Sequence, residues 1–168
     1  MPLHTLHDLL LRELSLLSSA EKQSLPVLER LQKCAENPRL ARLIRAHADE
    51  TREQIARLDR AFVELESRPR NGATGCMRGL RQDCVEIASM PEVDAHVRDA
   101  ALVAALQHLE HDEVAAYGCA RTWAKVLGLR QVASLLQRSL DEEHAMDSRL
   151  SKLAESLNKA AVEPELAA

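Results

Sequence analysis

Carboxylates interrupt the apolar stripe of each of four predicted helices in this sequence. Consecutive helical residues are about 100° apart around the axis, so the position of each acid relative to its stripe can be worked out. Glu113 lies about 20° from Leu102, and Glu143 lies about 20° from the stripe of its own helix. Glu21 continues the apolar series of the first helix, and Glu50 lies about 80° from the stripe of the second. The sequence therefore predicts that acids from four helices meet inside the protein.

Further polar side chains accompany these acids. On the second helix, His47 and Gln54 lie within about 40° of the apolar stripe. Glu110 and Asp147 lie about 80° and about 60° from the stripes of the third and fourth helices. We expect Glu110, Asp147 and His47 to complete or orient a set of metal ligands. Gln54 is expected to hydrogen-bond a ligand carboxylate instead of binding metal itself.

Several carboxylates in one aliphatic core need a physical explanation. An unpaired ionised carboxylate costs several kcal/mol there, and neighbouring carboxylates repel, so some must stay protonated unless cations are present. A pair of divalent ions removes both problems, and an oxygen-rich donor set with at most one imidazole favours Fe, Mn or Mg over Zn or Cu. The predicted metal ligands are Glu21, Glu50, Glu113, Glu143, Glu110, Asp147 and His47. The alternative is a bundle without metal, whose acids pair with water, Gln54, His47 and one another.

The two halves of the sequence resemble each other. A shift of 92 residues places Glu21 on Glu113, and a shift of 93 places Glu50 on Glu143. The acids of the first half are 29 residues apart and those of the second half are 30 apart. Two helical hairpins related by a pseudo-twofold axis would bring all four acids to one level, as a dinuclear metal site requires.

Apolar periodicity and chain punctuation predict four long helices. They cover about residues 4–35, 38–67, 94–127 and 129–160. Asn37 before Pro38 is typical of a helix start, and Gly128 is typical of a C-terminal cap. The connection over residues 67–98 is about 30 residues long and contains a short helical pattern. A link of that length suits second and third helices that run parallel, with the chain crossing the length of the bundle between them.

The order of short loop, long crossover and short loop is typical of an all-α, ferritin-like four-helix bundle, with a short extra helix in the crossover between helices 2 and 3. An extended array of helical hairpins would satisfy the same periodicity. We expect a single domain over residues 1–161 and a frayed tail over residues 162–168.

The composition argues against other classes of protein. The 168 residues are 46% hydrophobic but include one Trp, one Tyr and one Phe, and β-branched residues form no strand-like runs, so an all-β fold is excluded. A net charge of −4 with interspersed charges offers no basic surface to nucleic acid. No apolar run approaches the roughly 18 residues that cross a bilayer, so we expect no membrane partner and a cytoplasmic location. The four cysteines form no C-x-x-C pair, which argues against a zinc knuckle.

Six segments carry a resemblance to a known family. They are A-E-K-Q at 20–23, H-A-D-E-T-R-E-Q at 47–54, C-M-R-G-L at 76–80, V-R-D-A-A-L at 97–102, L-E-H-D-E-V-A-A-Y-G at 109–118 and L-D-E-E-H-A-M-D at 140–147. In this order they resemble the bacterial ferritin-like family typified by YciF, over about residues 4–157. The resemblance implies a ferritin-like bundle with an added crossover helix, a homodimer and an association with bacterial stress responses. It implies no established reaction.

The match to di-iron proteins proper is weaker. Those proteins carry Glu on two helices and Glu-x-x-His on the other two. Here Glu53 follows Glu50 by three residues and Met146 follows Glu143 by three, so both expected histidines are missing. His47 instead precedes its glutamate by three residues.

Two functional hypotheses from different classes follow. The first is a metal-binding, ferritin-like stress protein. If it is an enzyme, we expect redox chemistry of ferroxidase or peroxidase type on a small-molecule oxidant, with Tyr117 as a nearby hydrogen-bond donor or redox-active phenol. The second is a metal-free interaction or scaffold protein with a vestigial site. An iron store is disfavoured, because nothing in the sequence specifies a closed shell of many subunits.

Overall fold

The computed structural model describes residues 3–70 and 75–162, and these residues form helices and no strands. The helices are α1 (Leu6–Cys34), α2 (Pro38–Glu64), α3 (Gly75–Ser89), α4 (Ala95–Val126) and α5 (Arg130–Val162). The predicted all-α class is therefore confirmed. In the part of the chain that the structure describes, none of the helices combines the length and the apolar character needed to cross a membrane.

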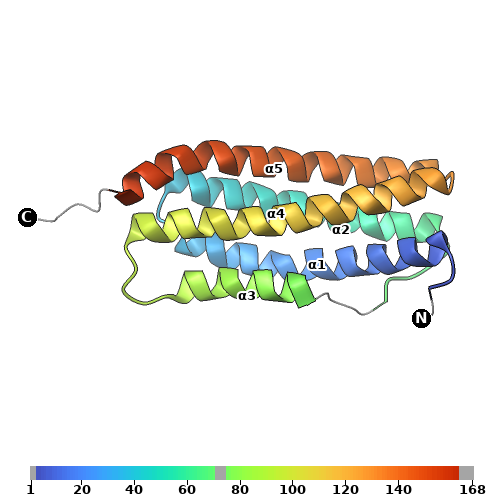
Figure 1. Ribbon diagram of the computed structural model, residues 1–168, viewed down its shortest axis with the longest axis horizontal. Coiled ribbons are helices and arrows are strands. Elements are labelled where there is room, and N and C mark those ends of the chain that lie inside the picture. Colours follow the sequence, from blue (N-terminus) through green and yellow to red (C-terminus); the bar gives the residue numbers. More distant parts are fainter. Residues whose placement is uncertain (1–2, 71–74, 163–168) are drawn as a thin grey trace, which may run out of the picture.

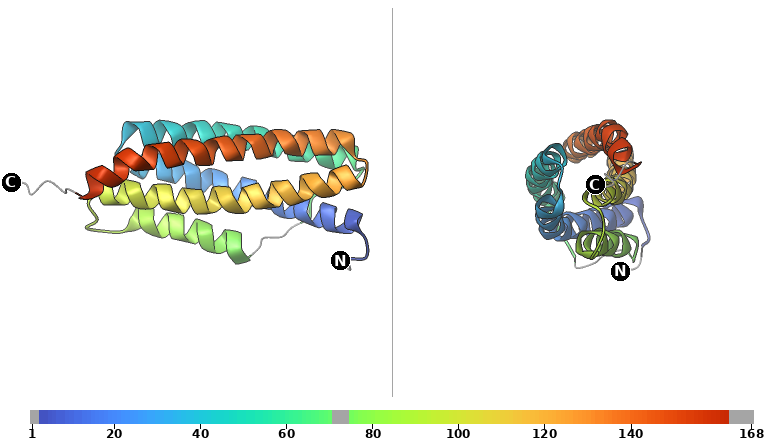
Figure 2. Two further views of the ribbon diagram at one scale, coloured as in Figure 1. Left: turned by 45° about the horizontal axis from the view of Figure 1, so that its top comes forward. Right: turned by 90° about the vertical axis from the view of Figure 1, so that its left-hand side faces the viewer.

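The four long helices form two antiparallel hairpins joined by a crossover. α1 packs against α2, and α4 packs against α5, while α2–α5 and α1–α4 contacts close the bundle. α2 and α4 both run from left to right in Figure 1, so the chain crosses the length of the bundle between them, as the long connection predicts. α3 packs on α1 and α4, and the end view in Figure 2 places it outside the ring of long helices.

Local signals define several helix ends. The Asn37 side chain accepts from the backbone N–H of Arg39 at 2.9 Å, and Pro38 is the first residue of α2, as predicted. Gly128 adopts a φ of +73° after α4, which confirms the predicted C-terminal cap. α2 ends at Glu64, earlier than the predicted residue 67, because Glu66 turns into the left-handed region with a φ of +46°. α5 continues to Val162, and the rest of the predicted tail lies outside the described residues.

The apolar core consists of two clusters that lie at different levels along the bundle. One cluster is built mainly from Leu28, Leu31, Leu40, Ile44, Leu102, Leu106 and Leu150. The other is built mainly from Leu10, Leu14, Leu58, Phe62, Tyr117, Val132 and Leu136. On α2, α4 and α5, the predicted residues Gln54, Glu113 and Glu143 lie between members of the two clusters, so the fold presents these polar side chains between two apolar regions.

Asp99 ties the two hairpins together at one end of the bundle. Its side chain is fully buried on α4 and accepts from the backbone N–H groups of Glu36 at 3.0 Å and Asn37 at 2.7 Å. These N–H groups belong to the short link between α1 and α2, so the carboxylate holds that link against α4. Charge-assisted hydrogen bonds of this kind contribute more to stability than neutral ones.

We expect Asp99→Ala to lower the free energy of unfolding by about 2–4 kcal/mol, because it leaves two backbone donors without their acceptor. Urea denaturation followed by circular dichroism measures the loss. Asp94→Ala is the matched control, since Asp94 caps the same helix from an exposed position. A loss for Asp99→Ala no larger than that of the control would contradict a linking role for this carboxylate.

Candidate metal centre

A layer of buried polar side chains crosses the middle of the bundle between the two apolar clusters. Every member is at most 4% exposed. We call it the polar layer, and it consists of Glu21 from α1, His47, Gln54 and Arg57 from α2, Glu110 and Glu113 from α4, and Ser139 and Glu143 from α5. Each long helix therefore brings at least one carboxylate or imidazole into the same interior level.

Four members of the polar layer converge on one point. His47, Glu110, Glu113 and Glu143 each offer one ligand atom, and these four atoms all lie within 4.8 Å of one another. Nε2 of His47 lies 3.1 Å from Oε1 of Glu110. Glu110 and Glu113 are three residues apart on α4, a spacing that directs both carboxylates to one side of the helix. We call these four residues the ligand group.

Glu21 lies beside the ligand group and is held by a tyrosine. The hydroxyl of Tyr117 donates to Oε1 of Glu21 at 2.5 Å, and both side chains are buried. Glu21 interacts electrostatically with His47, Glu110 and Glu113. The expected neighbour relation between Tyr117 and the acids is therefore present, and α1 adds a fourth carboxylate to the layer.

Gln54 and Arg57 occupy the α2 side of the layer. The side-chain amide of Gln54 donates to Oε1 of Glu143, which confirms its predicted role as a hydrogen-bond partner. Arg57 donates through Nε to the hydroxyl of Ser139 at 3.0 Å and through Nη2 to Glu142. These contacts fix the α5 side of the layer, and Arg57 places a positive charge near Glu21.

Glu50 and Asp147 lie at the edge of the layer, outside the ligand group. Both carboxylate oxygens of Glu50 lie within 3.0 Å of Nη2 of Arg149, and its Oε2 lies 3.8 Å from Nδ1 of His47. Asp147 accepts from the side-chain amide of Gln107 at 3.1 Å. The side chains of Glu50 and Asp147 are 28% and 27% exposed. Of the seven predicted ligands, the structure thus gathers five in the layer and leaves these two at its rim.

Burial raises the pKa of three carboxyl groups in the polar layer, those of Glu21, Glu113 and Glu143. The pKa of Glu21 rises to about 7, with burial as the main cause and the hydrogen bond from Tyr117 acting against it. Burial and then the neighbouring carboxylates raise the pKa of Glu113 and Glu143 well above the usual range. In the absence of a cation, burial and mutual repulsion therefore favour the neutral forms of Glu113 and Glu143 over their ionised forms.

The charges around His47 stabilise its imidazolium form. Burial alone would lower the pKa of His47, but Glu110 and Glu50 together hold it well above the ordinary value. Burial likewise opposes the ionisation of Glu50, yet His47 and Arg149 keep the pKa of Glu50 below its usual range. Glu50 is therefore ionised and faces the ring nitrogen opposite to the one that approaches Glu110. A carboxylate in that place typically orients a metal-binding histidine.

The chemistry of the donors fits cations. Among the described residues, Oε2 of Glu110, Oε1 of Glu113 and Oε2 of Glu143 are buried without a hydrogen-bond partner, and Oε1 of Glu110 has only its ion pair with Nε2 of His47. Buried polar atoms are nearly always partnered in folded proteins, so a cluster of unpartnered acceptor oxygens needs an explanation. These oxygens are the ligands that hard divalent ions prefer. The residues present therefore could hold metal.

Sequence reasoning missed two buried arginines near the site. Arg57 follows Gln54 by three residues, so its place on the same face could have been noticed. Arg81 lies four residues after Met77 and three before Cys84, both of which are buried on α3. Arginines on an apolar face commonly extend their charged groups to solvent, so the sequence does not indicate that Arg57 and Arg81 are buried.

Comparison with known families gives a match over nearly the whole chain. Residues 5–163 match a family described as a domain of unknown function, DUF892. Protein YciF of Escherichia coli strain K12 is 40% identical over 164 residues, which cover 96% of this chain and 98% of the relative.

Solved structures show the same fold. The crystal structure of the Escherichia coli stress protein YciF matches with a TM-score of 0.89 and 36% identity, over 94% of this chain and 99% of that chain. YcfI from Rhodopseudomonas palustris matches with a TM-score of 0.83 and 34% identity, over 88% and 94% of the two chains. A protein from Xanthomonas campestris matches with a TM-score of 0.77 over 96% and 99% of the chains, and its 21% identity supports a likeness in fold alone. The predicted ferritin-like bundle is confirmed.

Proposed function

The chain belongs to the family described as a domain of unknown function, DUF892, and we propose that it is a metal-binding protein. In this proposal the polar layer holds two divalent ions, Fe or Mn. One observation carries the proposal. Four buried ligand atoms from three helices lie within 4.8 Å of one another, and each of the three glutamates that supply them has a buried oxygen without a hydrogen-bond partner among the described residues.

Charge balance supports two ions. Glu21, Glu110, Glu113 and Glu143 carry four negative charges when all are ionised, and each is at most 3% exposed. Ionised carboxylates in such surroundings are strongly disfavoured unless opposite charge neutralises them. Two divalent cations supply four positive charges and leave His47 free to bind as a neutral imidazole. Glu21, next to the ligand group, would then serve the second ion.

The donor set supports iron or manganese. Carboxylate oxygens suit Mn, Mg and Fe, whereas an imidazole donor suits Fe more than Mg. In the absence of thiolate ligands at this level, a preference for Zn or Cu has no basis among the described residues. Mg remains an outcome that metal analysis would identify.

The surrounding residues have distinct roles in this proposal. Glu50, held by Arg149, lies 3.8 Å from Nδ1 of His47 and adds negative charge beside the ring, whose Nε2 faces Glu110 of the ligand group. Gln54 orients Glu143, and Tyr117 holds a proton next to Glu21. Bound Fe or Mn would supply redox chemistry, such as oxidation of ferrous iron or reduction of peroxide. The Escherichia coli relative is described as a stress protein, and we propose the same broad role for this chain.

Metal analysis tests the proposal. We expect protein purified without chelators and loaded with Mn(II) or Fe(II) to retain about two ions per chain after gel filtration. The double variant Glu113→Gln, Glu143→Gln is expected to retain less than a fifth of that amount, because both substitutions remove ligand oxygens. Glu53→Gln is the matched control, since Glu53 is an exposed acid on α2. Inductively coupled plasma mass spectrometry measures the content.

Two specific contacts favour a second candidate function, that of a metal-free interaction protein. Gln54 bonds Glu143 and Tyr117 bonds Glu21, so part of the layer is satisfied without cations. Equal and low metal content in the native protein and the double variant would support this second candidate and exclude the first.

A further inference from the structure

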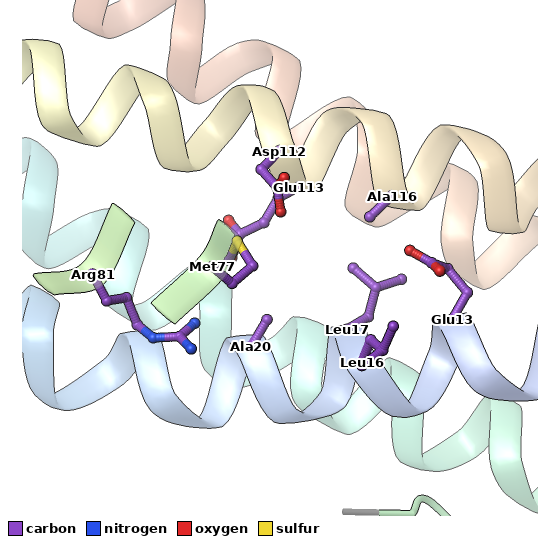
Figure 3. A pocket seen from close by; sticks show the side chains of 9 residues that line it. All are labelled: Glu13, Leu16, Leu17, Ala20, Met77, Arg81, Asp112, Glu113 and Ala116. Carbon is purple, nitrogen blue, oxygen red and sulfur yellow. The ribbon is translucent and has the colours of Figure 1, made fainter. Parts of the chain in front are cut away.

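A small pocket lies between α1, α3 and α4 and reaches the ligand group. Figure 3 shows the side chains that line it, with Glu113 and Asp112 on α4 and Glu13 on α1. Its volume is about 30 Å³, enough for about two water-sized molecules. Glu13, Asp112 and Ala116 on its outer wall are half-buried, whereas Glu113 on its inner wall is buried. The pocket therefore leads from the accessible surface to a member of the ligand group.

Carboxylates mark both ends of this pocket. Glu13 and Asp112 lie at the outer end on different helices, and they interact: burial is the main cause that raises the pKa of Glu13, and Asp112 adds to it. One oxygen of Asp112 also accepts from the thiol of Cys76 at 3.4 Å. At the inner end, Oε1 of Glu113 is buried and has no partner among the described residues. A cation that enters would meet the carboxylates of Glu13, Asp112 and Glu113, while the rest of the lining, apart from Arg81, is apolar.

One positive side chain, that of Arg81, also lines the pocket. Arg81 is 6% exposed, and its Nη2 donates to Oε1 of Gln23 at 3.1 Å. Its guanidinium interacts with Glu113 and Asp112, whose carboxylates raise the pKa of Arg81 against the larger lowering effect of burial. The lining thus contains three carboxylates, one guanidinium and several apolar side chains, and its net negative charge favours cations over anions.

The opposite side of the bundle is less suitable for cations. There the acids Glu50 and Glu142 already pair with the guanidinium groups of Arg149 and Arg138. Arg149 contacts both carboxylate oxygens of Glu50 and covers the approach to His47 from that side. A divalent ion would have to displace these guanidinium groups, whose positive charge repels it at short range.

We propose that the pocket between α1, α3 and α4 is an entry site for divalent cations, in which Glu13 and Asp112 capture the ion and Glu113 receives it. This inference rests on the proposed metal-binding function and adds the path by which the ions reach the ligand group. Opposed carboxylates at the mouth raise the local concentration of cations and thereby the association rate, an effect that salt weakens.

The first test changes the charge of the pocket. We expect the variant Glu13→Gln, Asp112→Asn to take up Mn(II) about 10-fold more slowly than the native protein at low ionic strength, with a weaker dependence on salt. The number of ions bound at equilibrium is expected to stay the same. Stopped-flow mixing with a fluorescent indicator of free Mn(II) measures the rate. The variant Glu53→Gln, Glu155→Gln is the control, since it removes the same charge from exposed positions elsewhere.

The second test narrows the pocket. Ala116→Leu places added bulk at the outer wall and is expected to slow uptake at least 10-fold, whereas Ala115→Leu on the exposed neighbouring position leaves the rate unchanged. Circular dichroism verifies folding, and if Ala116→Leu does not fold, the charge variants alone test the entry site.

Native rates and native salt dependence in the pocket variants would overturn the entry site while leaving the metal centre intact. A native protein that binds no Mn(II) would instead overturn the proposed function and this inference together.

Discussion

Replacing Glu113 and Glu143 by glutamine is expected to stabilise the metal-free protein and to abolish its response to metal. Burial and the neighbouring carboxylates raise the pKa of each acid well above the usual range, so ionising these acids costs more free energy in the folded protein than in the unfolded chain. Glutamine is neutral and of similar size. We therefore expect the metal-free double variant to have a higher free energy of unfolding than the metal-free native protein at pH 7.5.

The native protein, unlike the double variant, should become more stable when it binds metal. At a free Mn(II) concentration of about 1,000 times Kd, one bound ion adds about 4 kcal/mol of stability. For a chain of this length that corresponds to a rise in Tm of about 8–16 °C per site. Differential scanning fluorimetry measures Tm with Mn(II) and with a chelator, and the double variant is expected to show no rise.

The Glu53→Gln variant controls for a change in surface charge, because Glu53 is an exposed acid of α2. It should behave like the native protein with and without metal. An equal rise in Tm for the native protein and the double variant would show that the metal binds elsewhere. No rise in either protein would support the metal-free candidate.

The fold could be predicted from the sequence because its signals are local. Leucines at helical spacing define the apolar stripes, Asn37 and Pro38 start α2, and Gly128 ends α4 with a positive φ. The length of the crossover then fixes the parallel arrangement of α2 and α4. The exact end of α2 was not predictable, because the left-handed turn at Glu66 is adopted by a residue with no intrinsic preference for it.

The candidate site was only partly predictable, because contacts between helices determine which of its acids are buried. Glu21, Glu113 and Glu143 are buried as their angular positions indicate. The angular position of Glu110 places it near the edge of its stripe, yet it is fully buried opposite His47 of α2. Glu50 has a similar angular offset but meets Arg149 of α5 at the surface. Angles around a single helix do not indicate which partner a neighbouring helix will present.

A further part of the site depends on α3, whose position no local pattern specifies. Its periodicity predicts a short helix, but not that the helix packs on α1 and α4. As a result of this packing, Arg81 approaches Glu113, and Met77 and Arg81 become part of the pocket lining. Such long-range placement follows from the packing of the whole bundle and not from any single segment.

Raising the pH from about 5 to about 8 is expected to destabilise the metal-free protein. The pKa of Glu21 is about 7 in the folded state against an ordinary value of 4.5, so between these values the folded protein binds more protons than the unfolded chain. Stability therefore falls as pH rises through this window, by about 3 kcal/mol from this group alone. The raised pKa of His47 acts with the same sign above its ordinary value of 6.5.

The choice of pH window separates this effect from ordinary acid denaturation. Glu50 has a lowered pKa, so its contribution is present above about pH 4.5 and is lost only under more acidic conditions. Urea denaturation in the presence of a chelator, at intervals between pH 5 and pH 8, measures the fall, and Glu21→Gln should reduce its slope. Because metal ions require deprotonated ligands, saturating Mn(II) should reverse the trend and raise stability over the same interval. A metal-free protein that becomes more stable between pH 5 and pH 7.5 would show that these carboxyl groups are already ionised and paired inside the bundle.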